Sequence, residues 1–265
     1  MTTPPTPRWR PAAPLCASPG RPAAPASPAW TSSGTAGAPT STSAVHSTAI
    51  GLRLHLLPYL YTQMACASLD HQPVLRPTFF DFADDPSAWL DNDEMMVGPD
   101  LLVAPVFEPG ARRRTLHLPA GAHAAGWFEW ATGRYLTGGQ SVTVDAPLHQ
   151  LPLFVRAGAL LPTTAADHDH AGTDEPSRLL HYFPAPGASG RSAAELHEDD
   201  GLRRAGQGQD WRRHRFEAEA GPEVLTLQAH AEGPGAGIQG ALPVRLPAGE
   251  RRRLRCVGSV FQRQG

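Results

Sequence analysis

The chain has 265 residues, three cysteines and a formal net charge of −2, and all 23 of its basic residues are arginine. This length allows one large domain or two small ones, and the weak charge indicates neither nucleic acid nor an anionic membrane surface as a partner. Cys16, Cys66 and Cys256 lie far apart and outside any metal-binding spacing, so we expect no disulfide framework, metal or other cofactor. Apolar runs fall short of the roughly 20 residues of a transmembrane helix, and no apolar segment typical of a secretory signal opens the chain. These features predict a cytoplasmic, soluble protein.

Residues 1–49 differ in composition from the rest of the chain. They consist almost entirely of Pro, Ala, Ser, Thr and Gly, and the first acidic residue is Asp70. Ordering such a segment costs roughly 1–2 kcal/mol per residue in backbone entropy, and little apolar surface is present to offset this cost. We therefore predict disorder over 1–49. The segment could be a flexible tail, or the product of GC-rich DNA translated out of frame.

A helix followed by a strand is predicted next. Residues 50–69 place apolar side chains at helical spacing, and Pro58 should kink or restart the helix. The mostly apolar segment 73–82 then predicts a strand. A helix followed at once by a nearly continuous apolar strand is typical of a parallel sheet that is covered on both faces. One such unit cannot form a barrel alone.

From Glu94 to Gly158 the pattern predicts short strands. Apolar runs at 95–97 and 101–104 are separated by Gly98 and Pro99, and alternating segments follow at 115–118 and 141–144. Thr132-Gly133 separates two aromatic segments and predicts a hairpin. A polar linker is expected at 163–176. A second β-rich region follows, with strands near 179–183, 215–218 and 224–228 and an acidic turn at 198–201. The whole pattern predicts β-sandwiches.

Four motifs in this order resemble the C-terminal part of glycoside hydrolase family 31, the α-glucosidase and α-xylosidase family. They are LLPYLYT, PVLRPTFFDF, VGPDLLVAPV and LPLFVRAGALLP, and HEDDGLRRAGQG is similar to a segment of the distal domain of that family. The resemblance implies a mainly β fold, with two C-terminal β-sandwich-like domains preceded by the last helix and eighth strand of a (β/α)8 barrel. Residues 50–90 would be this barrel remnant, 91–165 the proximal sandwich and 166–265 the distal β-domain, which could be truncated.

The same resemblance implies a retaining α-glycosidase mechanism, in which two carboxyl groups lie roughly 5–5.5 Å apart. In this family both carboxylates lie on earlier barrel strands, the nucleophile in a W-x-D-M-N type segment. The sequence contains no such segment, so no catalytic residue can be assigned. Clustered acids do follow the predicted strand, but helix caps and solvated turns explain them better than catalysis. These acids are Asp84, Asp85, Asp91, Asp93 and Glu94.

Phe80 and Asp81 are the candidate substrate-binding residues. They close the predicted strand at the end where barrels build their active sites, so in an intact enzyme they could line the rim of a sugar pocket. Packing within the core or rim is the competing interpretation. The aromatic hairpin of Trp127, Phe128, Trp130 and Tyr135 could stack on sugar rings, although a role in the sandwich core explains it at least as well.

Three further patterns have simpler interpretations. His168-Asp169-His170 could bind a metal, but it lies in the polar linker without a further ligand at suitable spacing. The acidic segment 198–201 is similar to a calcium loop but lacks the later ligands, so a tight turn is expected. The triple arginines at 112–114 and 251–253 are interpreted as solvated faces.

Three functions remain open. The chain could be the C-terminal fragment of a family 31 α-glycosidase that acts on α-linked glucosides or xylosides and is inactive alone. It could be a carbohydrate-binding β-sandwich without catalysis, or the docking subunit of a split glycosidase. A carbohydrate is the expected small-molecule partner. The exposed barrel remnant could lead to self-association, because its apolar strand would have open edges.

Overall fold

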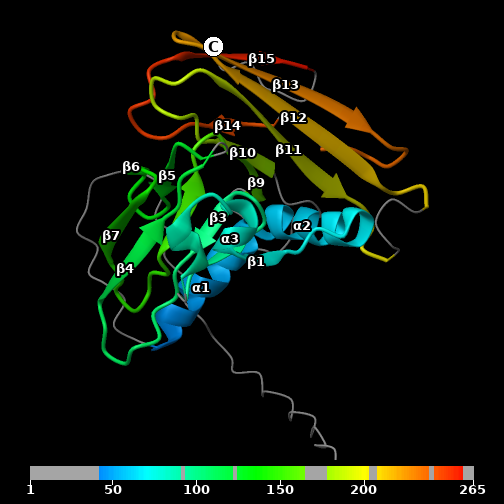
Figure 1. Ribbon diagram of the computed structural model, residues 1–265. Helices are drawn as coiled ribbons and strands as arrows, with labels where there is room; N and C mark the ends of the chain where they lie inside the picture. Colours follow the sequence, from blue (N-terminus) through cyan, green and yellow to red (C-terminus); the bar gives the residue numbers. More distant parts are fainter. Residues whose placement is uncertain are drawn as a thin grey trace, which may run out of the picture.

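The computed structural model describes residues 42–90, 93–121, 124–164, 178–202, 208–238 and 242–258. These residues form a mainly β protein, in which two helices lie against several small sheets (Figure 1). The predicted fold class is therefore confirmed as mainly β. In the part of the chain that the structure describes, no helix is long and apolar enough to span a membrane.

Two helices follow one another at the start of the described chain, α1 (Thr42–His55) and α2 (Leu57–Asp70). Pro58 lies in the first turn of α2, where its missing N–H interrupts the hydrogen-bond ladder from α1, so the predicted restart is confirmed. The predicted disorder over 1–49 is wrong for residues 42–49, which are helical. Leu52 of α1 packs on the core, and from there the helix continues toward its start through exposed residues. Residues 1–41 lie outside the described residues.

The segment predicted as strand 73–82 is mostly not a strand. Only β1 (Leu75–Pro77) is extended, and it is followed by the short helices α3 (Thr78–Asp81) and η1 (Pro86–Trp89). Pro77 cannot donate a ladder hydrogen bond, and the backbone turns immediately after it. The neighbour of β1 is β2 (Met95–Val97), with which it pairs antiparallel, Leu75 opposite Val97. The expected unpaired barrel strand is therefore the paired edge strand of a larger sheet.

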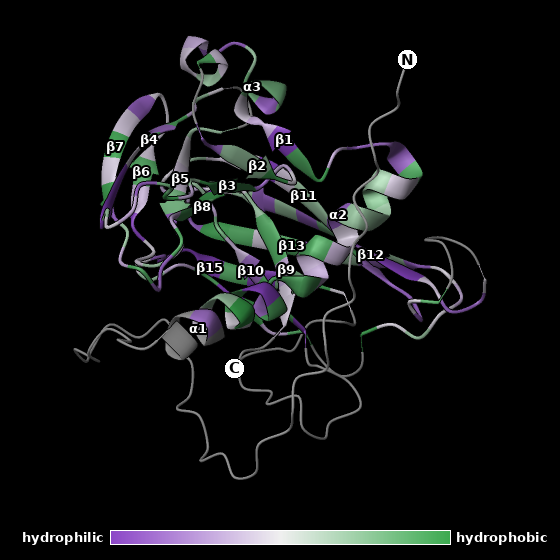
Figure 2. Cartoon of the chain, turned by 90° about the horizontal axis from the view of Figure 1, so that it is seen from below, coloured by the Kyte–Doolittle hydropathy of each residue, from purple (hydrophilic) through white to green (hydrophobic). Residues whose placement is uncertain are grey.

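The proximal sandwich combines a large sheet with a small one. The large sheet has the order β1-β2-β3-β8-β5-β6, and β4 pairs with β7 in a two-stranded sheet. The remaining strands of the large sheet are β3 (Leu101–Val103), β5 (Gly126–Glu129), β6 (Tyr135–Thr137) and β8 (Leu153–Arg156). In the small sheet, β4 spans Arg113–Leu118 and β7 spans Gln140–Asp145. Hydrophobic and hydrophilic residues alternate along β4 and β7 in Figure 2, as expected for strands with one buried face. Side chains from both sheets, including Met96, Leu116, Trp127 and Phe154, form one core.

The helices cover the opposite face of the large sheet. Leu56, between the two helices, and Tyr59 of α2 pack with Leu101, Phe128 and Val155 in a second core. The turn between β2 and β3 approaches α2 closely at Gly98, whose φ is +61°. A Cβ at this position would lie 2.3 Å from the Tyr59 hydroxyl, so only glycine fits there.

The distal sandwich also has two sheets, with the orders β14-β10-β9 and β11-β12-β13-β15. The first contains β9 (Leu160–Thr164), β10 (Arg178–Tyr182) and β14 (Val244–Arg245). The second contains β11 (Gly190–Glu198), β12 (Arg212–Ala220), β13 (Val224–Glu232) and β15 (Arg253–Val257). Leu160, Leu180, Phe216, Leu225 and Leu227 are among the buried side chains between them.

The boundary between the two sandwiches lies earlier in the sequence than expected. Strand β9, placed by sequence in the proximal domain, pairs antiparallel with β10 of the distal one, with Leu160 opposite Tyr182. The chain passes from β8 to β9 through residues 157–159, where Gly158 has a φ of +97°. The distal sandwich thus includes β9, and the predicted boundary at 165/166 corresponds to a connection inside its first sheet.

Candidate functional site

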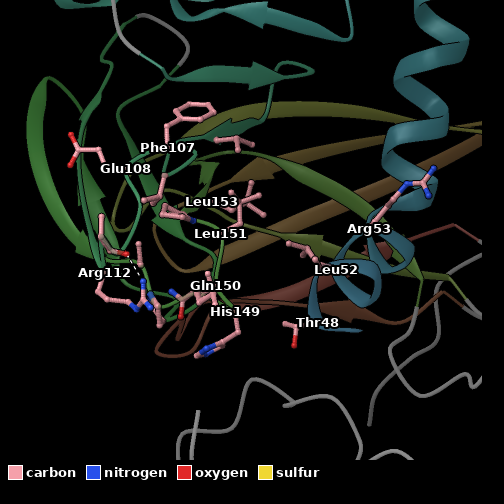
Figure 3. A pocket seen from close by; sticks show the side chains of 18 of the residues that line it. Thr48, Leu52, Arg53, Phe107, Glu108, Arg112, His149, Gln150, Leu151 and Leu153 are labelled. Atoms are coloured by element: carbon pink, nitrogen blue, oxygen red, sulfur yellow. Dashed lines mark hydrogen bonds between the residues drawn. The ribbon is translucent and has the colours of Figure 1, made fainter. Parts of the chain in front are cut away.

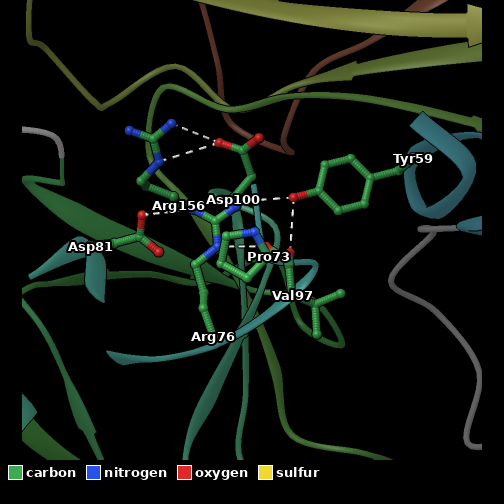
Figure 4. Close-up of polar contacts among 7 residues, drawn as sticks. All are labelled: Tyr59, Pro73, Arg76, Asp81, Val97, Asp100 and Arg156. Carbon is green, nitrogen blue, oxygen red and sulfur yellow. Dashed lines mark hydrogen bonds and ion pairs between the residues drawn. The ribbon is translucent and has the colours of Figure 1, made fainter. Parts of the chain in front are cut away.

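The candidate residues Phe80 and Asp81 lie on α3. Asp81 lies at the edge of a network of charged side chains (Figure 4). The Asp81 carboxylate accepts a hydrogen bond from Arg76 Nη1 at 3.1 Å, and the Arg76 guanidinium lies 5.1 Å from the centre of the Phe80 ring. Burial raises the pKa of Asp81, while the charge of Arg76 acts in the opposite direction. The structure therefore brings the two candidates together around Arg76.

The network continues from Arg76 into the large sheet. Arg156, the last residue of β8, donates from Nη2 to the Asp100 carboxylate at 2.7 Å. The Tyr59 hydroxyl of α2 donates to the Val97 carbonyl at 2.9 Å and accepts from the Asp100 backbone N–H at 3.2 Å. Asp100 and Arg76 are buried, and burial raises the pKa of Asp100 against the influence of Arg156. Both carboxylates of this network face arginines, which compensate their charge where burial is unfavourable, and neither is an exposed nucleophile.

Aromatic side chains surround α3 on the solvent side. Phe80 is half exposed, and Phe79 stacks on Trp89 of η1 with ring centres 4.6 Å apart. The Trp89 indole N–H donates to the Ala83 carbonyl at 2.8 Å, which fixes the ring. Sequence patterns do not predict this pair. Phe79, Phe80 and Phe82 are the only local signal, because the stacking depends on the turn between α3 and η1.

The clustered acids near η1 have structural partners. Asp85 caps η1 by accepting from the Ser87 N–H at 2.9 Å, and it also binds His117 Nε2 at 2.8 Å. Burial alone would raise the pKa of Asp85, but the hydrogen bonds from His117, Ala120 and Ser87 lower it. Glu94 is buried and accepts from the His117 N–H at 2.9 Å. Asp84 and Asp93 are exposed, and Asp91 lies outside the described residues.

The aromatic hairpin belongs to the core. Trp127 is fully buried and donates its indole N–H to the Pro119 carbonyl at 2.8 Å, and Phe128 lies 5.2 Å from the Tyr135 ring. Trp130 is partly buried against Phe183. These contacts favour the core interpretation over sugar stacking for this hairpin.

The acidic segment 198–201 forms the expected tight turn. Asp199 accepts from the Gly201 N–H at 2.8 Å, and Asp200 accepts from the Leu202 N–H at 3.0 Å. Across the described ranges, no group of three or more His, Cys, Asp and Glu side chains could hold a metal. His168, Asp169 and His170 lie outside these ranges.

The interpretation of the second arginine triplet as a solvated face is wrong for Arg252. Its side chain is only 7% exposed and pairs with Glu250 at 2.7 Å. Its guanidinium also donates to the Ala188 and Ala185 carbonyls, each at 3.0 Å. Arg252 therefore joins the loop after β10 to the chain before β15. Arg113 of the first triplet is 71% exposed, as predicted.

An open groove of about 560 Å³ lies beside α1 (Figure 3). Its walls are α1, the segment after β3 and the segment before β8. Most of the lining is apolar, and polar groups are scattered along it without a pair of carboxylates. Labelled examples are Leu52, Phe107, Leu151 and Leu153 among the apolar residues and Glu108, Arg112 and His149 among the polar ones. No local pattern predicts this groove, because its walls come together only in the tertiary fold.

The fold and these contacts define a helix pair carried on two β-sandwiches, in which the described acids near the candidate site have structural partners or are exposed. Residues 71–161 match the family model described as "Glycosyl hydrolase family 31 C-terminal domain". This part of the chain is therefore a glycoside hydrolase family 31 C-terminal domain, as the motifs predicted. The eighth-strand and barrel assignment of 50–90 stays a prediction.

Known proteins of this family are similar to the chain over part of their length. Alpha-glucosidase 2 of Bacillus thermoamyloliquefaciens is 33% identical over 69% of this chain and 22% of its own length. The alpha-xylosidase of Saccharolobus solfataricus is 33% identical over 58% of this chain and 20% of its own length. The chain thus spans about a fifth of these relatives.

Solved structures show the same relation. The Flavobacterium johnsoniae GH31 dextranase has a TM-score of 0.65 and 26% identity, covering 74% of this chain and 24% of its own. The GH31 alpha-xylosidase of Xanthomonas citri has a TM-score of 0.63 and 29% identity, covering 77% of this chain and 22% of its own.

Proposed function

We propose that this chain is the non-catalytic C-terminal part of a retaining α-glycosidase that acts on α-linked glucosides or xylosides, and that it does not hydrolyse them alone. A retaining mechanism needs one carboxylate to attack the anomeric carbon and a second carboxyl group to protonate the leaving oxygen. The relatives named alpha-glucosidase and alpha-xylosidase support the substrate class.

The observation that carries the proposal is the occupation of the candidate carboxylates. Asp81 is held by Arg76, Asp100 by Arg156, and Asp85 by two backbone N–H groups and His117. A nucleophile must present a free oxygen to the sugar, and a general acid must hold a proton that it can deliver. These carboxylates are engaged by Arg76, by Arg156, or by His117 and backbone N–H groups, and the remaining Asp81 Oδ2 is buried, so we assign neither role to them.

The test is hydrolysis of 4-nitrophenyl α-glucoside and α-xyloside by the purified full chain. We expect release of nitrophenol no faster than with heat-inactivated chain. Turnover that is saturable and disappears in Asp84→Asn or Asp81→Asn would overturn the proposal. Leu202→Ala, a change in the exposed distal turn, is the matched control.

Carbohydrate binding without catalysis is the second candidate, and the exposed Phe79–Trp89 stack favours it. Aromatic faces bind sugar rings, and Phe80 and Asp81 next to this stack would form the rim that the sequence predicts. The dextranase structure was determined with isomaltotriose, which is therefore a suitable probe. Saturable heat on titration that is lost in Trp89→Ala and Phe80→Ala but kept in Leu202→Ala would support this function. Absence of heat with the wild-type chain would exclude it for this ligand.

A third role follows from the same exposed side chains, which could contact a separately encoded barrel or a second copy. Leu75 is 61% exposed and Phe80 is 50% exposed. We expect concentration-dependent self-association through this surface, measured by light scattering after gel filtration. Leu75→Ser combined with Phe80→Ser should weaken it, whereas Leu202→Ser should not. A monomer at all concentrations would contradict self-association.

A further inference from the structure

Two histidines meet where α1 contacts both sandwiches. His55 lies in the last turn of α1 and His181 lies in the middle of β10, with ring centres 5.5 Å apart. The Trp130 ring, which follows β5, lies 5.8 Å from His55 and 5.7 Å from His181. Phe183 stacks against His181 at 6.0 Å. The two imidazoles therefore occupy an aromatic enclosure built from α1, the proximal sandwich and the distal one.

This enclosure suits neutral imidazoles only. His181 is 3% exposed, and its Nε2 is buried without a hydrogen-bond partner among the described residues. His55 Nδ1 is also buried without a hydrogen-bond partner among the described residues. A neutral ring has one nitrogen without hydrogen that can stay unpaired, but a protonated ring carries two N–H donors and a charge that burial penalises.

The charged surroundings make protonation still less favourable. The charged side chain facing both rings is Arg245 of β14, which is opposite His181 in the strand register. On the β9 side, His55 has a hydrogen bond to the backbone of Thr164. The neighbouring Trp130 and Phe183 rings are uncharged. Burial, His55 and Arg245 lower the pKa of His181 to about 3. Burial also lowers the pKa of His55, partly opposed by the hydrogen bond to Thr164.

Two other buried histidines of the distal sandwich have acidic neighbours. His197 Nε2 lies 3.3 Å from the Asp199 carboxylate, and His214 Nε2 lies 3.5 Å from the Glu198 carboxylate. The groups that act on the pKa of His55 and His181 include no such carboxylate.

We propose that His55 and His181 form an acid-sensitive latch that holds α1 against the two sandwiches at neutral pH and releases it when the imidazoles take up protons. Released α1 exposes both rings to water, so they regain the ordinary histidine pKa of about 6.5. Below that pH the released state binds more protons than the closed one, and proton uptake favours release. Because Leu52 of α1 also lines the groove, release opens the groove.

Hydrogen exchange of the full chain, measured by mass spectrometry between pH 7 and 5 and corrected for the intrinsic rates, tests the latch. Each proton taken up on release raises the opening constant by up to about tenfold per pH unit below 6.5, so the two imidazoles together raise it by up to about a hundredfold per pH unit. We expect peptides from 42–55 to lose protection by up to about this factor, while peptides from β12 and β13 change little. Carboxyl groups with raised pKa, such as Asp81 and Asp100, would act in the opposite direction, because acid favours their buried form.

Two phenylalanine variants fill the enclosure without an ionisable group. His181→Phe and, separately, His55→Phe should each reduce the pH response of α1, and the double variant should remove it. His230→Asn, an exposed histidine of β13, is the matched control and should respond like wild type. If His181→Phe does not fold, His55→Phe alone decides the question. An unchanged pH response in either folded variant, or unchanged α1 protection down to pH 5 in the wild type, would overturn the latch.

Discussion

α1 and α2 are neighbours in the chain but are attached to the sandwiches in different ways. α2 makes hydrogen bonds to both sandwiches, through Tyr59 to the β2–β3 turn and through Thr62 to the His197 N–H at 3.0 Å. α1 rests mainly on apolar contacts and on the neutral histidine of its last turn, which has a hydrogen bond to the backbone of Thr164. Polar contacts in buried positions are costly to break, whereas apolar packing at a partly exposed helix is lost in steps. We therefore expect α2 to unfold with the whole molecule and α1 to open by itself.

The largest effect should come from the charged network under α2. Arg156→Met leaves the Asp100 carboxylate buried without its cation, which should cost about 3–5 kcal/mol of unfolding free energy. Urea unfolding followed by fluorescence measures it. Arg113→Met removes an exposed pair at 3.6 Å and should cost at most about 1 kcal/mol. Equal costs for the two variants would show that the network does not anchor this region.

Thr62→Val tests the polar contact between α2 and β11. The change keeps the side-chain shape but leaves the buried His197 N–H without an acceptor, at a cost of about 1–3 kcal/mol. Thr143→Val is a control of the same chemistry, because this hydroxyl is exposed on β7. If α2 behaved like α1, Thr62→Val would raise hydrogen exchange only in 57–70 and leave the global transition unchanged.

Tyr61→Phe should have a smaller effect that depends on pH. The Tyr61 hydroxyl donates to Asp199, and burial together with that carboxylate raises the pKa of Tyr61 to about 12. The folded state therefore holds the proton more tightly than an unfolded chain with a pKa of about 10, and stability from this group is lost as pH rises from 10 to 12. We expect the variant to lose about 1 kcal/mol at neutral pH. Its stability should then decline less steeply than wild type above pH 10 in thermal unfolding.

Leu52→Ala should have the smallest effect on global stability. Leu52 is partly buried on α1, so truncation should change the global unfolding free energy by less than about 1 kcal/mol while exchange in 42–55 rises. Leu102→Ala, at a fully buried position of β3, should cost about 2–5 kcal/mol and serves as the contrast. A comparable global loss for Leu52→Ala would mean that α1 unfolds together with α2.

Much of the fold follows from local sequence patterns. The strands from β2 to β13 alternate or form short apolar runs between Gly and Pro turns, and Pro58 marks the helix restart. The segment 73–82 was misassigned because its apolar residues fit a buried strand. Pro77 and the contact between Arg76 and Asp81 instead turn the chain after three extended residues. The antiparallel partner of β1 lies beyond two short helices, at a distance that local patterns do not specify.

The candidate sites are harder to predict from sequence than the strands, because they depend on tertiary contacts. Phe80 and Asp81 could be selected from sequence by their place in a family motif, but their shared partner Arg76 could not. His55 and His181 carry no motif, and their contact arises only when α1 packs across β9 and β10. The burial of Arg252 was missed for the same reason, since its acceptors Ala185 and Ala188 lie in a distant loop.

The short connection from β8 to β9 has a consequence for how this molecule would respond to heat. Residues 157–159 give the two sandwiches no flexible spacer, and the Gly158 N–H donates to the Phe183 carbonyl of the distal side at 2.7 Å. Domains joined by long linkers melt as separate units, whereas units that share strands and contacts melt together. A calorimetric scan should therefore show a single heat-absorption peak for both sandwiches, and neither sandwich should be obtainable as an independent folded fragment by cutting at residue 165.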